Sequence, residues 1–205
     1  MLRRLRTKIM GEKNIILIIS GPAGSGKNTV AERLMGEYDN VKRVITSTSR
    51  PPRGAEVDGV DYHFLSPEQF ERDIAAGKFY EYAKVHDRYY GTSKKAVSES
   101  LERGNDLILI IDVQGAETWR RIAAEHPELA EKLTSVFIAP DSIDELRRRL
   151  KGRATESDAD IDRRMKTAEY EFGQADKFDR RIDSKTKDED YAALKKIYLD
   201  IKGVK

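Results

Sequence analysis

The chain has 205 residues, of which 36% are charged, and a formal net charge of +2 with a pI near 8.6. This length supports one good hydrophobic core, and the balanced charge predicts a solvated surface without a strong global field, which gives no sign of nucleic-acid binding. The absence of cysteine excludes disulfides, thiolate catalysis and cysteine metal sites, and the spacing of His63, His86 and His126 is not that of a zinc site.

Residues 1–10 are basic but lack the apolar centre and the small-residue cleavage site of a secretory signal. We interpret them as a solvated, frayed terminus rather than as a targeting segment. No apolar run approaches the roughly 20 residues of a membrane span. The sequence therefore predicts a cytoplasmic protein without a membrane partner.

Apolar runs alternate with helical patterns along the chain. The apolar runs predict strands of a buried parallel sheet, namely Ile15–Ser20, Val41–Ile45, Leu107–Asp112 and Leu133–Ala139. Apolar spacing and capping residues predict helices at Lys27–Glu37, Pro67–Ala76, Lys94–Arg103, Gln114–Glu125, Ile143–Leu150, Asp160–Phe172 and Asp188–Ile201. Strand alternating with helix predicts a three-layer α/β fold around a parallel central sheet.

Two regions break this alternation. The stretch from Thr46 is rich in arginine, glycine, proline and tyrosine, with short strands expected at Asp61–Leu65 and Phe79–Val85, and indicates a small inserted subdomain. A later arginine-rich stretch, interrupted by Gly152, indicates a short helical lid. The expected division is a core formed by residues 1–45, 97–146 and 171–205, an insert at 46–96 and a lid at 147–170.

The first strand leads into a glycine-rich turn and a helix, with Gly21, Gly26 and Lys27 in the register of a P-loop, G-x-x-x-x-G-K-[ST]. Glycines let backbone N–H groups close around a phosphate chain, the helix presents its positive end, and the lysine adds a mobile charge. A glycine-rich turn without a ligand is the alternative, but strand, spacing, lysine and helix all agree with the motif. The expected triphosphate-binding residues are Gly21, Pro22, Ala23, Gly24, Ser25, Gly26, Lys27, Asn28 and Thr29.

The insert carries the residues that suggest the second substrate. Arg50 and Arg53 stand three apart in a turn stiffened by two prolines, and fixed guanidinium forks suit a phosphate dianion. Tyrosine hydroxyls downstream can add donors. Glu81 can accept from two adjacent N–H groups, such as those of guanine, although by itself it is as well explained as a neighbour in a buried strand.

Taken together, these segments resemble the guanylate kinase family from about residue 14 to the C-terminus, with order and spacing kept. The segments that carry the resemblance are Gly21–Thr29, Ser49–Gly54, Gly59–Phe64, Tyr89–Gly91 and Ile111–Gly115. The arginine-proline-arginine turn followed by Tyr-Tyr-Gly is more specific than the P-loop. The resemblance implies a P-loop nucleoside monophosphate kinase that transfers the γ-phosphoryl group of ATP to GMP, and to dGMP.

The resemblance also implies residue roles. The expected catalytic residues are Lys27, Arg50 and the lid arginines Arg149, Arg153 and Arg164. The expected GMP-binding residues are Thr46, Arg50, Arg53, Tyr62, Glu81, Tyr90, Thr92 and Asp112. Mg²⁺ is the expected cofactor, with Asn28 as a ligand through its amide oxygen or through water, and Asp112 acting indirectly.

Several of these side chains also have simpler interpretations. Arg147 and Arg148 are expected on a solvated helix face, and Tyr80, Tyr82 and Tyr89 as packing residues. Trp119 is expected in the core or an interface, and His63 in a structural role. Of the adjacent Arg163 and Arg164, about 100° apart on a helix, the family register selects the second.

Two positions depart from the family pattern. Asn28 stands where a serine or threonine contacts Mg²⁺, and Thr29 brings a hydroxyl one residue late, about 100° around the helix. We therefore expect metal use to be retained but weaker. Ser184 stands where the family has asparagine, which puts the adenine contact and the strictness of ATP as donor in question.

Two other functions compete with the kinase interpretation. Guanylate-kinase-like domains can bind phosphopeptides without catalysis, but those usually have an eroded P-loop, whereas Lys27 and the loop glycines remain here. A P-loop kinase for another phosphorylated small molecule is disfavoured by Glu81, Arg50 and Arg53. The sequence leaves the oligomeric state open between monomer and homodimer.

Overall fold

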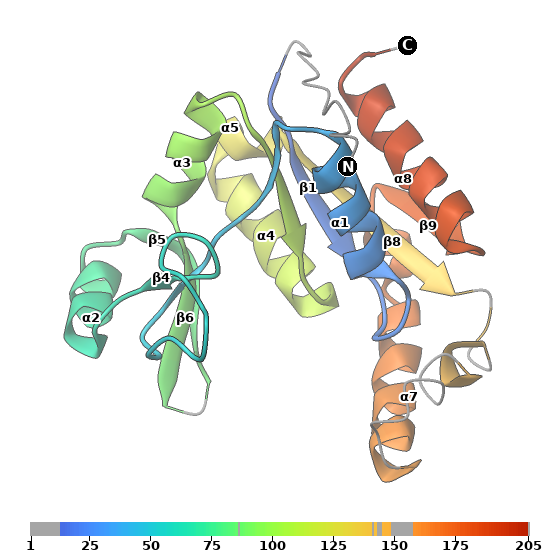
Figure 1. Ribbon diagram of the computed structural model, residues 1–205, viewed down its shortest axis with the longest axis horizontal. Coiled ribbons are helices and arrows are strands. Elements are labelled where there is room, and N and C mark those ends of the chain that lie inside the picture. Colours follow the sequence, from blue (N-terminus) through green and yellow to red (C-terminus); the bar gives the residue numbers. More distant parts are fainter. Residues whose placement is uncertain (1–12, 86, 141, 143–144, 149–157, 205) are drawn as a thin grey trace.

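A computed structural model describes residues 13–204 except 86, 141, 143–144 and 149–157, and it leaves the side chains of residues 85 and 158–164 undescribed. Much of the predicted helix 143–150 therefore lies outside the described residues. In Figure 1 the insert stands at the left of the core, and helix α7 extends below it.

The core is a parallel sheet with the strand order β2-β7-β1-β8-β9. The strands are β1 (Ile16–Ser20), β2 (Val41–Arg43), β7 (Asp106–Ile110), β8 (Leu133–Pro140) and β9 (Arg180–Ser184). The predicted strands are confirmed, with corrections at their ends. The second ends at Arg43 rather than Ile45, and the third ends at Ile110 because Asp112 instead caps the following helix.

Strand β1 explains the three layers, because its apolar residues alternate between two cores. Leu17 and Ile19 belong to a cluster with α1 (Lys27–Glu37) and α8 (Lys187–Ile201). Ile16 and Ile18 belong to a cluster on the other face, against α3 (Lys94–Glu102), α4 (Val113–Glu125) and α5 (Pro127–Ala130). Both faces of the sheet are thus covered, as the sequence predicted. Among the described residues, no helix has both the length and the hydropathy to cross a membrane.

Helix α7 (Asp158–Phe172) ends close to the nucleotide-binding loop. Its residues Met165 and Ala168 are buried in a small separate cluster with Leu146, and Ala23 of the loop packs against them. A short 3-10 helix, η1 (Ala175–Lys177), then leads to β9. The small cluster places the end of α7 beside the P-loop.

The insert is a second, four-stranded sheet with one helix. Its strand order is β4-β3-β6-β5, and its elements are β3 (Ser47–Thr48), β4 (His63–Phe64), α2 (Pro67–Ala75), β5 (Phe79–Val85) and β6 (Arg88–Ser93). The strand expected at Asp61–Leu65 is therefore only two residues long. Phe70 of α2 fixes the helix on the sheet by stacking on Phe79 and Tyr89, with ring centroids 4.5 and 5.2 Å apart.

Some local details differ from the sequence predictions. Ser66 and Gln69 have the spacing of a capping box, and Ser66 does cap α2 by accepting from the Gln69 backbone N–H. The Gln69 side chain bonds to Asp73 instead of reaching back, so only half of the box forms. Tyr82 is 52% exposed, so its interpretation as a packing residue is wrong. Trp119 is buried, as expected, and lies against Tyr80.

A buried polar network fastens the C-terminal helix to the sheet. Asp106 Oδ1 accepts from Lys202 Nζ at 3.0 Å and from the Ile15 backbone N–H at 3.0 Å, while Oδ2 accepts from Asn40 and from the Tyr198 hydroxyl. The side chains of Lys202 and Asp106 are each only 2% exposed. Removing one partner would leave a buried charge uncompensated.

We therefore expect Lys202→Met to lower the free energy of unfolding by about 3 kcal/mol. Urea unfolding monitored by circular dichroism measures this change, with Lys196→Met, an exposed lysine on the same helix, as the matched control. A loss no larger than that of the control would show that the network contributes little to stability.

Candidate nucleotide-binding and phosphoryl-transfer site

The loop between β1 and α1 has the backbone of a phosphate cradle. Gly21, Gly24 and Gly26 have φ values of 138°, 91° and 95°, which L side chains rarely adopt. A Cβ on Gly21 would lie 2.3 Å from the Ile138 carbonyl oxygen, so the first glycine is required by space as well. No side chain caps the start of α1, so its first N–H groups suit an anion.

The predicted triphosphate-binding side chains lie around this loop. Lys27 Nζ donates to the carbonyl oxygens of Gly21 and Pro22, the latter at 2.9 Å, so the amine lies over the loop. Asn28 is exposed at the first turn of α1. Thr29, the next residue of the helix, lines a neighbouring cavity.

That cavity, about 520 Å³ in volume, joins the P-loop to the C-terminal region. Gly24 and Gly26 line one side, and Lys185 and Thr186 line the other. Ser184 is fully buried, and its hydroxyl donates to Asp190 at 2.7 Å. Its partner Asp190 lines the cavity together with Lys185 and Thr186, whereas Ser184 itself is not among the lining residues.

The insert sheet gathers most of the predicted acceptor residues on one face. Thr48 pairs with Tyr90 and Glu81 pairs with Thr92, so these four side chains point to the same side. The Thr92 hydroxyl donates to Glu81 Oε1 at 2.6 Å, which fixes the carboxylate. We call this side the acceptor face.

Contacts and strand alternation extend the acceptor face to three further predicted residues. The guanidinium of Arg50 lies 5.3 Å from the centroid of the Tyr62 ring, and that ring lies 6.2 Å from the ring of Tyr90. Thr46 directly precedes β3 and lines a cavity of about 200 Å³ together with Tyr62 and Glu56. Arg53 is exposed in the same loop.

Arg50 is held by a partner that the sequence reasoning missed. Its Nη1 and Nη2 donate to the two carboxylate oxygens of Glu56 at 2.7 and 2.9 Å, and Glu56 also accepts from the Arg53 backbone N–H at 2.7 Å. Arg50 is only 6% exposed. Hydrogen bonds from Arg50 and from the Arg53 backbone lower the pKa of Glu56 to about 2, and Glu56 in turn raises the pKa of Arg50. The available signal was an acid three residues after Arg53 in a short loop.

This arrangement uses the end-on edge of the guanidinium, because both terminal nitrogens donate to Glu56. The side edge, with Nε, has the geometry for a second bidentate contact with a phosphate. The bidentate contact with Glu56 therefore fixes the orientation of the Arg50 guanidinium.

We expect Glu56→Gln to raise the KM for GMP about tenfold and leave the KM for ATP within twofold, because a neutral amide orients the guanidinium less firmly. Because the pKa of Glu56 is lowered from 4.5, its ion pair with Arg50 has its full strength at any pH above 4.5. That strength is lost only as the pH falls towards 2 and the carboxylate becomes protonated. The KM effect should therefore be constant between pH 6 and 9. Initial-rate kinetics with each substrate varied measure it, and an equal change in both KM values would contradict the assigned role.

Two acids lie near the P-loop lysine. Asp112 follows β7 and caps α4, its Oδ1 accepting from the Gly115 backbone N–H at 2.7 Å. Glu171, at the end of α7, is 7% exposed. Burial raises the pKa of Glu171, while the charge of Lys27 lowers it and that of Asp112 raises it. Sequence reasoning found Asp112 but missed Glu171, because its position depends on how α7 packs.

The predicted lid arginines can be followed only in part. Arg149 and Arg153 lie outside the described residues, and Arg164 lies in α7 with its side chain undescribed. Arg147 and Arg148 are exposed, and Arg148 pairs with Glu145, as expected for a solvated helix face.

Within the described residues, no cluster of three or more His, Asp or Glu side chains could hold a metal ion by itself. The oxygens of Asn28 and Asp112 are exposed next to the phosphate cradle, and oxygen donors suit Mg²⁺, which usually keeps several waters. The residues present therefore fit a cation that arrives with a triphosphate.

Comparison with known proteins agrees with this geometry. The model of the guanylate kinase family matches residues 13–200. The guanylate kinase of Clostridioides difficile (strain 630) is 40% identical over 168 residues, which cover 82% of this chain and 78% of that protein. The guanylate kinase of Rickettsia felis is 38% identical over 186 residues, which cover 91% and 92%.

A solved structure gives the same result. The crystal structure of guanylate kinase from Anaplasma phagocytophilum superposes with a TM-score of 0.63 at 28% identity, covering 92% of this chain and 86% of that one. The family model and the relatives match nearly the whole chain, and the phosphate cradle and the acceptor face agree with them. The chain therefore belongs to the guanylate kinase family.

Proposed function

We propose that this protein transfers the γ-phosphoryl group of ATP to GMP, giving ADP and GDP. The observation that carries the proposal is the acceptor face, where Glu81 is held by Thr92 and Arg50 is oriented by Glu56. We include dGMP as a substrate, because these contacts concern the base and the phosphate rather than the ribose 2′-hydroxyl.

Base selection follows from the Glu81 carboxylate. Guanine presents two adjacent donors, N1–H and the N2 amino group, to an acceptor pair, whereas adenine presents an acceptor at N1. With one oxygen already accepting from Thr92, the carboxylate would meet guanine in a fixed orientation. A polar site built for such donors rejects a base that lacks them, because its own groups would stay unpaired.

Phosphate binding would use Arg50 and Arg53, with the hydroxyls of Tyr62 and Tyr90 as further donors. The attacking group is a phosphate oxygen that is already anionic, so no general base is needed. The protein contributes alignment of the two nucleotides and positive charge around the moving phosphoryl group.

The donor would lie with its phosphates in the glycine cradle and its nucleoside in the 520 Å³ cavity. Lys27 supplies charge to the terminal phosphates from its place over the loop. Arg149, Arg153 and Arg164 are proposed to bring further charge from the lid.

Guanylate kinases generally use ATP together with Mg²⁺, which offsets charge on the phosphates. In this chain we propose that the amide oxygen of Asn28 contacts the ion directly or through water, with Asp112 acting through bound water. A neutral amide oxygen replaces the hydroxyl of the usual motif.

We expect Asn28→Ser to lower the Mg²⁺ concentration for half-maximal activity severalfold, since it restores the usual motif. Steady-state rates across a Mg²⁺ series measure this, with Asn105→Ser at the opposite end of the sheet as control. An unchanged metal dependence would show that Asn28 is not part of the metal contact.

A coupled ADP-release assay with GMP, dGMP, AMP, UMP and CMP tests the proposed function. We expect turnover with GMP and dGMP and rates at least 100-fold lower with the others. No turnover with GMP, together with intact binding of GMP or of a phosphopeptide, would indicate a binding module. Preferred turnover of another acceptor would indicate a different kinase.

A further inference from the structure

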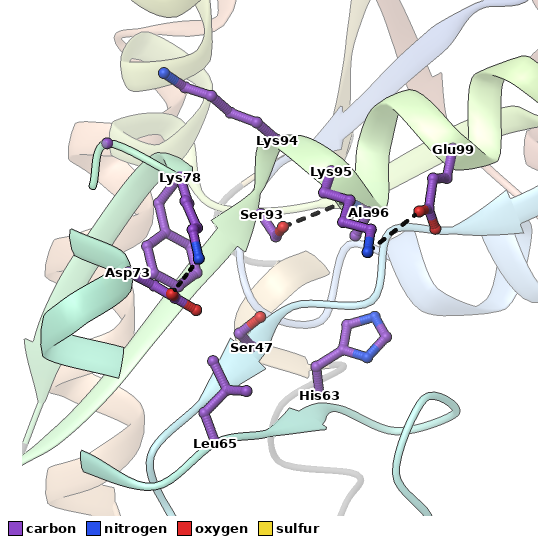
Figure 2. Close-up of a pocket in the computed structure, with 12 residues that line it drawn as sticks. Ser47, His63, Leu65, Asp73, Lys78, Ser93, Lys94, Lys95, Ala96 and Glu99 are labelled. Carbon is purple, nitrogen blue, oxygen red and sulfur yellow. Dashed lines mark hydrogen bonds and ion pairs between the residues drawn. The ribbon is translucent and has the colours of Figure 1, made fainter. Parts of the chain in front are cut away.

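A second cavity, of about 700 Å³, lies behind the acceptor face (Figure 2). Its position follows from strand alternation, because adjacent residues of a strand point to opposite sides. Thr46 is on the acceptor face, so Ser47 points to the other side, as does His63, its partner in β4. We call this space the rear cavity. It is partly open to solvent and is bounded by the insert sheet, the end of α2 and the first turn of α3.

Ser47 is an unusual lining residue. It is only 3% exposed, and its hydroxyl makes no hydrogen bond within the described part of the chain. The next two residues are both bonded: Thr48 Oγ1 donates to the Tyr89 carbonyl and Ser49 Oγ accepts from the Tyr89 N–H. In Figure 2 the Ser47 oxygen is turned into the cavity. The hydroxyl faces the space of the cavity and is free to bond a ligand atom there.

Several other polar groups line the cavity around Ser47. The first turn of α3 faces the cavity, where Ser93 Oγ accepts from the Ala96 N–H. Lys95 is at the rim and only loosely paired with Glu99, at 3.6 Å. Of the other lining lysines, Lys78 is paired with Asp73 at 2.7 Å and Lys94 points away from Ser47 in Figure 2, so Lys95 is the one that remains for a ligand. Its loosely paired ammonium can donate to an anionic group.

The remaining walls are apolar. Leu65 and Phe79 line the cavity on the sheet side, and Gly77 lines it at the end of α2. The volume lies in the range of about 300–1,000 Å³ of small-molecule sites, which are largely apolar with a few convergent polar groups. Size and lining thus fit a small organic molecule better than a bare ion.

We propose that the rear cavity binds a small molecule with an apolar body and one anionic group, a phosphate or a carboxylate. The anionic group is held by the Ser47 hydroxyl, the His63 ring and the Lys95 ammonium, and the body packs on Leu65 and Phe79. This site goes beyond the proposed kinase activity and does not depend on it.

Occupancy would be felt at the acceptor face, because the two sides share backbone. Ser47 follows Thr46, and Ser93 follows Thr92, whose hydroxyl fixes Glu81. A ligand that orders Ser47 and Ser93 therefore changes the affinity for GMP, and by linkage GMP changes the affinity for the ligand equally.

The test is titration of the full chain with phenyl phosphate, benzoate and inorganic phosphate, followed by backbone amide NMR. We expect phenyl phosphate or benzoate, but not inorganic phosphate at the same concentration, to shift the amides of Ser47, His63 and Ser93–Ala96. The double variant Ser47→Ala, Lys95→Gln should weaken this binding at least tenfold. Lys42→Gln, an exposed lysine on β2, is the matched control.

The two variant sites are outside the proposed catalytic machinery, so kcat with saturating substrates should stay within twofold and report an intact enzyme. Phenyl phosphate that binds at Arg50 instead would be unaffected by the double variant, and this outcome overturns the proposal. So does the absence of shifts at these amides up to about 10 mM, a weak-fragment affinity. A Kd for GMP that is the same with and without saturating probe would overturn the coupling.

Discussion

Lys27→Met is expected to lower kcat about 10³-fold or more, a size typical of losing a main electrostatic contact to the transition state. Lys27 Nζ donates hydrogen bonds to the carbonyl oxygens of Gly21 and Pro22 in the phosphate cradle. Methionine keeps most of the side-chain length but removes the charge and the hydrogen bonds of the amine. Because the charge on the transferred group spreads in the transition state, the loss should be larger in kcat than in the KM for ATP.

Single-turnover rates at saturating ATP and GMP measure this effect directly. Lys42→Met, an exposed lysine on β2, is the control and should behave as wild type. If Lys27→Met changed only the KM for ATP, the lysine would serve ground-state binding, and its catalytic assignment would be wrong.

The second large effect is expected at Arg50. Arg50→Met should lower kcat/KM for GMP about 10³-fold, because it removes a charge-assisted fork to the phosphate and leaves Glu56, a permanent anion, facing the substrate. The KM for ATP should change little. A large loss in kcat/KM for GMP with an unchanged KM for ATP would thus assign Arg50 to the acceptor side of the site.

Two further variants sharpen the Arg50 result. Arg50→Lys keeps the charge without the fork and should recover only part of the activity. Arg103→Met removes an exposed arginine paired with Glu99 and should be neutral. Urea unfolding of each variant separates loss of the fold from loss of binding. Full activity in Arg50→Lys would contradict the bidentate contact.

The fold was largely predictable because its signals are local. The apolar run Ile15–Ile19 and the glycine spacing after it determine the strand, the cradle and the start of α1 from adjacent residues. The strand ends were less predictable. The run after Leu107 continues to Asp112 in composition, but the side chain of Asp112 accepts from Gly115 N–H and begins a helix.

The predicted acceptor residues came from the family resemblance, and the strand register explains why they share a face. Glu56 was missed because its partner Arg50 is defined by the fold of a loop, not by a sequence period. Glu171 was missed for a related reason. Its burial beside Lys27 depends on the packing of Met165 and Ala168 against the P-loop region, which no local pattern encodes.

The way in which the insert is attached limits how it can move. On the incoming strand, the Val44 N–H donates to Ile108 of the core, while the Thr46 carbonyl accepts from His63 of the insert. Only Ile45 lies between these two anchors. Where the chain leaves the insert, the Lys94 N–H donates to the Lys78 carbonyl, which anchors this second connection to the insert.

The core anchor on the outgoing side is Val97, which is buried in the cluster against β1 and β7. A rigid rotation of the insert therefore has two pivots, the torsions of Ile45 and those of the single helical turn Lys94–Val97. The line through these two segments would be the hinge axis of the insert. Substitutions that restrict the backbone at either hinge segment should slow the rotation of the insert without changing any residue of the acceptor face.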